Sequence, residues 1–193
     1  MPEHCKSGLE KVSYSCYIIK HSEINDMKNI AKPPEITLVL DRLRSAFNTG
    51  NIFRIAEAVG AREIIACGYT PAPPHPKLAK TAMNADQMVP CRQIATSLEA
   101  VNMLRAEGVK QILAVESDPD GVPAWKFDYV FPLALVFGNE ALGIERETIA
   151  ACDGVICLPM FGDKASINVG NSAAAVLYAI IAKAEIRKAG LKL

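Results

Sequence analysis

A run of six consecutive apolar residues, from Pro132 to Phe137, limits the folds that are open to this chain. A strand with one face in water alternates apolar and polar residues, whereas a strand that is covered on both faces is apolar throughout. The shorter run from Val155 to Leu158 also has the length of a buried strand. Helices on both faces of a mostly parallel sheet cover strands of this kind. The two runs therefore predict an α/β fold.

Strand and helix patterns alternate along the rest of the chain. Further strands are expected at 35–40, 63–67, 89–91 and 111–115. Helices are expected from Asn48 to Gly60, from a capping box at Thr96 to Gly108, at 146–151, and from about Ala173 onward. Pro90 would place its strand at a sheet edge, and the proline-rich segment 69–85 is expected to be a loop. This alternation supports a mostly parallel sheet with helices on both faces.

The length of 193 residues fits one domain, which is expected over 35–193 after a short extension over 1–34. Within the extension, residues 13–20 could form a strand or part of a helix. Pro33 and Pro34 close it, because the residue before a proline avoids helical backbone angles. The chain carries 21 basic and 21 acidic residues, so its formal net charge is zero. Any nucleic-acid binding must therefore come from a local basic patch.

The six cysteines are scattered along the chain, and none belongs to a CxxC pair. This pattern predicts neither a disulfide framework nor a zinc site, and it indicates a reduced, cytoplasmic protein. The longest apolar runs are expected to be too short to span a membrane. Charged residues interrupt the N-terminal region where a signal peptide would have its apolar core. We therefore expect no membrane partner.

The motifs of several common enzyme classes do not occur in the sequence. No G-x-G-x-x-G follows a strand, as it does in dinucleotide-binding folds, and there is no G-x-x-x-x-G-K-[ST] phosphate loop. There is no G-x-S-x-G nucleophile motif, and the three histidines are not in a hydrolase arrangement. No cluster of His, Asp and Glu in the sequence suggests a metal site.

Polar loops that contain glycine follow three of the expected strands. They are Asn48-x-Gly50-x-x-x-Arg54, Gly138-Asn139-Glu140-x-x-Gly143, and Pro159-Met160-x-Gly162 with Ser166-Ile167-Asn168. In a parallel sheet, such loops lie at the same edge, where α/β proteins bind their ligands. Glycines let backbone amides and carbonyls approach a ligand closely. We therefore expect one binding site where the three loops meet.

These loops resemble the three sequence motifs of the SpoU/TrmH family of RNA ribose 2′-O-methyltransferases, in the SPOUT superfamily. Residues 48–54 match N-x-G-x-x-x-R, residues 137–143 match F/G-x-E-x-x-G, and residues 158–169 match I-P-M followed by S-L-N-V. The order agrees, and the resemblance covers roughly residues 35–185. Two departures are Ile167, where Leu is commoner, and Gly170, where a small polar residue is more usual. A glycine there would loosen the start of the last helix.

The resemblance implies a C-terminal trefoil knot, S-adenosylmethionine as the methyl donor, and an obligate homodimer with the active site near the interface. It also implies tRNA or rRNA as the substrate and no metal. Carried over by position, the polar active-site residues would be Arg54, Asn48, Glu140, Ser166 and Asn168. The residues near the cofactor would be Gly138, Leu158, Ile167, Leu135 and Met160.

The arginine that Arg54 matches is proposed in the family to help deprotonate the ribose 2′-hydroxyl. An arginine has a pKa above about 12, so Arg54 should not act as a simple base. Our hypothesis is that Arg54 orients the hydroxyl or an RNA phosphate and that the proton leaves through that phosphate. Without the motif, Arg54 would be interpreted as a solvated helix residue that pairs with Glu57.

Structural interpretations of other residues also stay open. Glu140 could cap the turn that follows it instead of taking part in catalysis. Ser166 and Asn168 could be helix caps as well as site residues. Three side chains in the segment 69–85 could contact RNA phosphates or could simply be solvated: His75, Lys77 and Lys80.

The sequence therefore favours an RNA methyltransferase that uses S-adenosylmethionine to methylate a ribose 2′-hydroxyl in tRNA or rRNA. A first alternative is a non-catalytic RNA- or cofactor-binding protein of the same knotted fold, and the intact polar residues of the motifs argue against it. A second is an α/β nucleotide-binding enzyme of another kind, and the missing phosphate-loop motifs argue against that.

Overall fold

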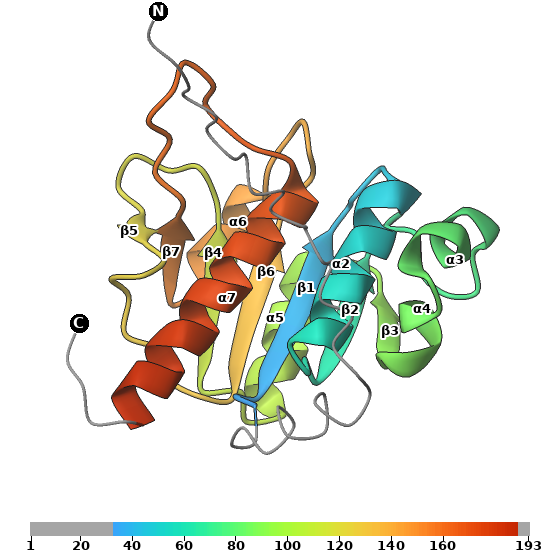
Figure 1. Cartoon of the computed structure of the whole chain (residues 1–193), viewed down its shortest axis with the longest axis horizontal. Helices are drawn as coiled ribbons and strands as arrows, with labels where there is room; N and C mark the ends of the chain where they lie inside the picture. Colours follow the sequence, from blue (N-terminus) through green and yellow to red (C-terminus); the bar gives the residue numbers. More distant parts are fainter. Residues whose placement is uncertain (1–32, 189–193) are drawn as a thin grey trace, which may run out of the picture. The chain divides into compact units, whose positions relative to one another are not determined.

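A parallel sheet forms the centre of the computed structural model, which describes residues 33–188 (Figure 1). Its seven strands are β1 (Ile36–Asp41), β2 (Glu63–Cys67), β3 (Cys91–Ile94), β4 (Gln111–Val115), β5 (Val122–Pro123), β6 (Leu133–Phe137) and β7 (Gly154–Cys157). The strand order is β3-β2-β1-β6-β4-β7-β5, and every neighbouring pair is parallel. This sheet confirms the predicted fold class and places β3 at an edge, as Pro90 indicates. The trefoil knot stays a prediction, and the element expected within residues 13–20 lies outside the described residues.

Helices cover both faces of the sheet, as Figure 1 shows. The helices within the described residues are α2 (Ala46–Ala58), α3 (Pro76–Ala82), α4 (Ala85–Met88), α5 (Ser97–Ala106), α6 (Arg146–Ala151) and α7 (Val169–Lys188). The pair α2 and α7 packs on one face and the pair α5 and α6 on the other. The short helices α3 and α4 pack beside α2.

Successive residues of the central strands point into two different hydrophobic cores. In β1, Leu38 and Leu40 join the core under α2 and α7, whereas Val39 joins the core under α5. In β6, Leu135 and Val136 divide in the same way. Because both faces are covered, neither set of positions can be polar, and this explains the continuous apolar run in the sequence.

Side-chain caps set the starts of α2 and α7 and correct the predicted boundaries. The Ser45 hydroxyl accepts a hydrogen bond from the backbone N–H of Asn48 at 3.2 Å, so α2 begins before Asn48. The Asn168 side-chain oxygen accepts hydrogen bonds from the first amides of α7 at 2.9 and 3.3 Å. That helix therefore begins at Val169 rather than near Ala173. In both cases, a short polar side chain satisfies amides that have no partner within the helix.

The segment 69–85 is not a loop throughout, because it contains α3. The His75 imidazole caps this helix by accepting a hydrogen bond from the backbone N–H of Leu78 at 3.2 Å. Pro76 follows at the first helical position, where no amide donor is needed. The loop prediction was wrong here because proline is as compatible with the first turn of a helix as with a loop.

The helix α7 has a property that the sequence analysis did not anticipate. Its residues Val169–Arg187 are long and apolar enough to cross a membrane, by length and composition alone. One stripe of this helix is buried in the core through Ala173, Val176, Leu177 and Ile180. A core helix of a globular fold can meet the same criterion, because one of its faces is apolar.

Candidate functional site

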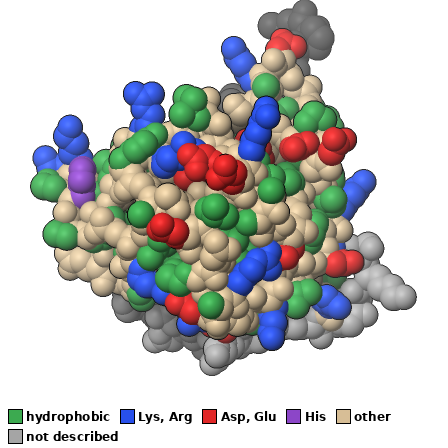
Figure 2. Space-filling view, turned by 180° about the vertical axis from the view of Figure 1, so that it is seen from behind, with side chains coloured by type: hydrophobic (Ala, Val, Ile, Leu, Met, Phe, Trp, Pro, Cys, Tyr) green, Lys and Arg blue, Asp and Glu red, His purple; other side chains and the backbone are tan. Residues whose placement is uncertain are grey.

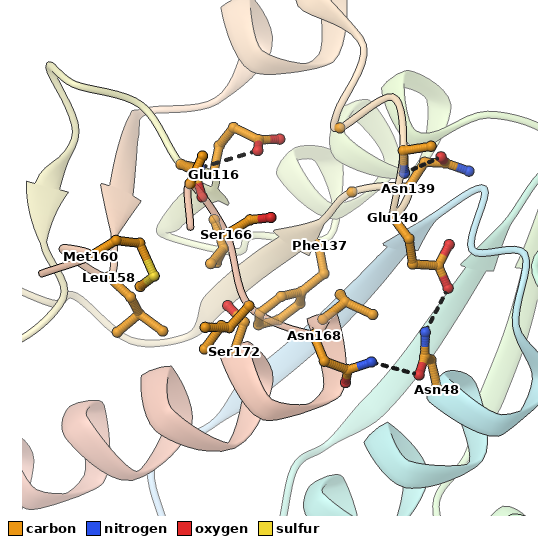
Figure 3. A pocket seen from close by; sticks show the side chains of 18 residues that line it. Asn48, Glu116, Phe137, Asn139, Glu140, Leu158, Met160, Ser166, Asn168 and Ser172 are labelled. Atoms are coloured by element: carbon orange, nitrogen blue, oxygen red, sulfur yellow. Dashed lines mark hydrogen bonds between the residues drawn. The ribbon is translucent and has the colours of Figure 1, made fainter. Parts of the chain in front are cut away.

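A cavity of about 560 Å³ opens at the edge of the sheet where β4, β6 and β7 end (Figure 3). Loops after these strands and the first turns of α2 and α7 form its walls. This edge is where parallel α/β sheets bind ligands. Most of the predicted site residues line the cavity: Asn48, Gly138, Glu140, Leu158, Met160, Ser166, Ile167 and Asn168.

A line of hydrogen bonds joins the three motif segments at the rim of this cavity, and Figure 3 shows it. The Asn48 side-chain amide donates to Glu140 Oε1 at 2.8 Å. The Asn168 side-chain amide in turn donates to Asn48 Oδ1 at 3.0 Å. Asn48 lies on α2, Glu140 follows β6, and Asn168 caps α7, so the line connects residues that are far apart in the sequence.

The Glu140 carboxylate binds the first two motif segments together. Besides Asn48, it accepts hydrogen bonds from the backbone amides of Arg44 at 3.0 Å and Ser45 at 3.4 Å. Burial alone would raise the pKa of this carboxyl, but the hydrogen bonds from Arg44, Asn48 and Ser45 outweigh it and hold the pKa of Glu140 below its ordinary value. Glu140 is therefore charged at neutral pH. Glu140 therefore joins the loop after β6 to the start of α2 instead of capping the turn that follows it, because Asn139 accepts from the amides of that turn.

The loop after β6 is rigid because a buried asparagine ties it to neighbouring segments. The Asn139 side-chain amide donates to the carbonyl of Arg42 at 2.6 Å and to the hydroxyl of Tyr69 at 3.0 Å. Its side-chain oxygen accepts from the backbone amides of Ala141 and Leu142 at 2.9 and 3.0 Å. This side chain is only 4% exposed, so the bonds fix the shape of one cavity wall.

Two motif glycines are needed because other atoms pack against them. A Cβ at Gly138 would lie 2.5 Å from the backbone nitrogen of Ile144, so the cavity wall could not close as it does. A Cβ at Gly50 would overlap Thr81, and the side chain of Thr81 donates to the carbonyl of Ala46 at 3.1 Å. The glycine of the first motif therefore allows α3 to pack closely on α2.

Gly170, one of the two departures from the family pattern, also has a packing explanation. A Cβ at this position would lie 2.5 Å from the side-chain nitrogen of Asn51. The backbone N–H of Gly170 donates to the Asn168 cap at 2.9 Å. The glycine thus leaves room for Asn51 of α2 at a helix start that is firmly capped.

Glu116 lines the cavity, although the sequence analysis did not identify it. This residue follows β4 directly, and its carboxylate accepts from the backbone N–H groups of Ile144 and Ser117, both at 3.1 Å. No motif includes this residue, so the resemblance could not find it. The available signal was its position, because a polar residue that follows a parallel strand lies at the ligand-binding edge.

Two of the predicted site residues, Leu135 and Arg54, do not line the cavity. Leu135 is fully buried in the middle of β6, with its side chain in the core, and its cofactor contact stays a prediction. Arg54 is exposed on α2, and within residues 33–188 no hydrogen bond or ion pair holds its side chain, including one to Glu57. It lines a separate hollow of about 430 Å³ with Met88 and Tyr178.

The three residues predicted to contact RNA also lie outside the cavity, on or next to α3. His75 is the cap of that helix, as described above. Lys77 and Lys80 are exposed. Figure 2 shows Lys or Arg side chains projecting beside a histidine at one edge of the molecule. Within the described part of the chain, no group of three or more His, Cys, Asp or Glu side chains is placed to hold a metal ion.

Comparisons with known proteins give one consistent result. Residues 35–178 match the model of the SpoU rRNA Methylase family. A tRNA (guanosine(18)-2′-O)-methyltransferase of Escherichia coli (strain K12) is 31% identical over 76% of this chain and 63% of its own. A 23S rRNA (uridine(2479)-2′-O)-methyltransferase of Streptomyces viridochromogenes is 28% identical over 73% of this chain and 50% of its own. This chain therefore spans between half and two thirds of the length of these relatives.

A solved structure shows the same fold. It is the SpoU methyltransferase AviRb of Streptomyces viridochromogenes in complex with the cofactor AdoMet. The TM-score is 0.71 at 26% identity, and the match covers 80% of this chain and 59% of that one.

Proposed function

Since this chain belongs to the SpoU rRNA Methylase family, we propose that it transfers the methyl group of S-adenosylmethionine to a ribose 2′-hydroxyl in tRNA or rRNA. The observation that carries the proposal is the line of hydrogen bonds from Glu140 through Asn48 to Asn168. It brings all three motif segments to one cavity. The two relatives described above are named as 2′-O-methyltransferases of tRNA and of 23S rRNA, which supports RNA as the substrate class.

The cavity fits S-adenosylmethionine in size and chemistry. Its volume of about 560 Å³ lies within the range of small-molecule sites. Apolar side chains of Phe137, Leu158 and Ile167 line it, and the backbone at Gly138 is open to a ligand because that residue has no side chain. These residues, with Met160, would hold the adenine and ribose of the cofactor. The bound cofactor would supply an activated methyl group on a positively charged sulfur.

The polar side chains at the rim would position the ribose. Asn48, Ser166 and Asn168 line the cavity close to the two α-helix starts, where hydrogen-bond donors are already fixed. Holding the hydroxyl in line with the methyl group is the main task of such a site, because alignment lowers the barrier. The O–CH₃ bond would form as the S–CH₃ bond breaks, and the hydroxyl proton would leave through an RNA phosphate. Exclusion of water by the apolar wall would assist the movement of charge.

The proposal includes a homodimer, which explains the position of Arg54. Met83, Met88 and Tyr178 are between 55% and 68% exposed and surround the same hollow as Arg54. Burial of this apolar surface against a second copy would stabilise a dimer. It would also place Arg54 near an active site, where the arginine would orient the ribose hydroxyl or an RNA phosphate.

The RNA would contact the surface of α3. Lys77 and Lys80 are exposed on this helix, which packs against the first turn of α2 that bears Asn48. Phosphate contacts position an RNA without reading its sequence. His75 would contribute mainly by capping α3 and so holding both lysines in place.

The direct test is transfer of labelled methyl from S-adenosylmethionine to unmodified tRNA and rRNA pools. We expect label in one of the two pools. Absence of label from both pools, with binding of S-adenosylmethionine intact, would contradict the proposal. It would favour the alternative of a binding protein with the same fold, for which the position of Arg54 outside the cavity is the supporting observation.

A further inference from the structure

Two carboxylates in the cavity wall would distinguish the cofactor before methyl transfer from the product that remains after it. We infer that Glu116 and Glu140 make this cavity select S-adenosylmethionine over its product S-adenosylhomocysteine by charge. The inference rests on the cofactor part of the proposed function. The two ligands differ by one methyl group and one unit of positive charge, because the sulfur is a sulfonium in the first and a neutral thioether in the second.

Both carboxylates are held in place on opposite sides of the cavity, and Figure 3 labels them. Glu116 follows β4 and accepts from the backbone amides of Ile144 and Ser117, both at 3.1 Å. Glu140 follows β6 and accepts from the Asn48 side chain at 2.8 Å. Because these bonds fix their positions, neither group needs to reorganise when a cation binds.

No positively charged side chain among the cavity-lining residues opposes these two carboxylates. The lining residues within the described chain include no Lys, Arg or His. Asp163 and Lys164 are neighbours in the exposed loop before α7, so their charges largely offset each other. The start of α7 also faces the cavity through Val169 and Ser172. Its partial positive charge favours the carboxylate that both ligands share, so it does not alter the choice between them.

This arrangement would help the enzyme to release its product. The wall attracts the ligand while the sulfur is charged and loses that attraction once the sulfur is neutral. S-adenosylhomocysteine would then leave the site more readily, and its accumulation would slow turnover less. A site without such charges would bind the two ligands through their common groups and would be inhibited by its product.

The test compares the dissociation constants of the two ligands by calorimetry in the wild type and in Glu116→Gln. We expect the wild type to bind S-adenosylmethionine more tightly, and Glu116→Gln to reduce that preference on the order of three- to tenfold. The ratio of the two constants is the useful quantity, because a loosened wall would weaken both ligands alike. Glu140→Gln should reduce the ratio in the same direction.

Two comparisons make the result specific to charge. Glu147→Gln removes an exposed carboxylate on α6 that does not line the cavity, and its ratio should equal that of the wild type. Sinefungin, which carries an amine in place of the sulfonium, should lose affinity in Glu116→Gln as S-adenosylmethionine does. An unchanged ratio in Glu116→Gln, or tighter binding of S-adenosylhomocysteine by the wild type, would overturn this inference alone. Failure to bind either ligand would count against the proposed function as well.

Discussion

Asn48 is the residue that connects the other two polar motif positions, because its side chain donates to Glu140 and accepts from Asn168. Replacement by alanine removes both bonds at once. We expect Asn48→Ala to lower kcat on the order of tenfold to a hundredfold, since the rim would no longer be held together. The fold should lose only about 1 kcal/mol per bond. Steady-state kinetics and urea unfolding measure the two effects, with the exposed Asn102→Ala as a control. A variant with normal kcat would show that this line of bonds is not part of the active site.

The stability contributed by Glu140 should depend on pH in a defined direction. Its pKa lies below the ordinary value of 4.5 in the folded protein, so its contribution is complete above that pH and is lost as the pH falls below it. The difference in unfolding free energy between the wild type and Glu140→Gln should therefore be larger at pH 7 than at pH 3.5. Urea titrations at both pH values measure it, with Glu147→Gln as the comparison. A difference that stays constant with pH would contradict the role of the Glu140 charge.

At the scale of elements, the sequence predicted the sheet better than the helix starts. The central strands were predictable because burial on both faces requires apolar residues at every position, as in Pro132–Phe137. The starts of α2 and α7 were not, because several polar residues near each start could act as the cap. In the structure, the caps are Ser45 and Asn168, and each also makes a hydrogen bond to a distant segment, to Glu140 and to Asn48 respectively. α3 was missed because Pro76 is compatible with a loop and with a first helical turn.

In the candidate site, too, some residues could be predicted from the sequence and others could not. The motif positions were predictable because each follows a strand and all strands are parallel, so Asn48, Glu140 and Asn168 had to meet. Glu116 belongs to no motif, so the resemblance could not identify it, and its position directly after β4 was the one sequence signal for its place in the cavity wall. Leu135 lies in the middle of β6 and not at its end, so it does not line the cavity.

The close packing of α3 on α2 should be sensitive to a single methyl group. In Gly50→Ala, the new Cβ would overlap Thr81 and lie 2.9 Å from the backbone nitrogen of Ala82, so α3 would have to move. We expect a loss of about 1–3 kcal/mol in the free energy of unfolding. Gly162→Ala is the matched control, because nothing lies within 4 Å of its new Cβ. Equal stability of both variants in thermal melts would contradict the packing that the structure shows.

The lysines of α3 should contribute to RNA affinity and to its salt dependence. We expect the double variant Lys77→Ala/Lys80→Ala to bind RNA about tenfold more weakly and to reduce the slope of log affinity against log salt by about 1.5. Binding of S-adenosylmethionine should not change, because neither lysine lines the cavity. Filter binding over a range of salt concentrations measures the slope.

A charge-matched variant separates this effect from net charge alone. Lys110→Ala/Lys126→Ala removes two exposed lysines that do not belong to α3. If both double variants lower the slope equally, the RNA has no preferred contact with α3.

The whole molecule is proposed to act as a dimer, and one exposed side chain offers a test. Tyr178 on α7 is 55% exposed and lines the same hollow as Arg54. Sedimentation of the wild type should give a mass of twice 20.8 kDa. Tyr178→Glu should give a monomer with little activity, because a charge would be buried in the interface. Val130→Glu, at a site with 52% exposure outside this hollow, should remain a dimer. A monomeric, fully active wild type would contradict the assembly.

The central claim is that this cavity methylates the ribose of an RNA rather than a base. The most direct measurement is alkaline hydrolysis of RNA that has been labelled with methyl from S-adenosylmethionine by the purified protein. A 2′-O-methyl group blocks the attack of the hydroxyl on the adjacent phosphate, so we predict that the label will remain in an alkali-resistant dinucleotide. Label that appears in ordinary mononucleotides would place the methyl group on a base and would contradict the account.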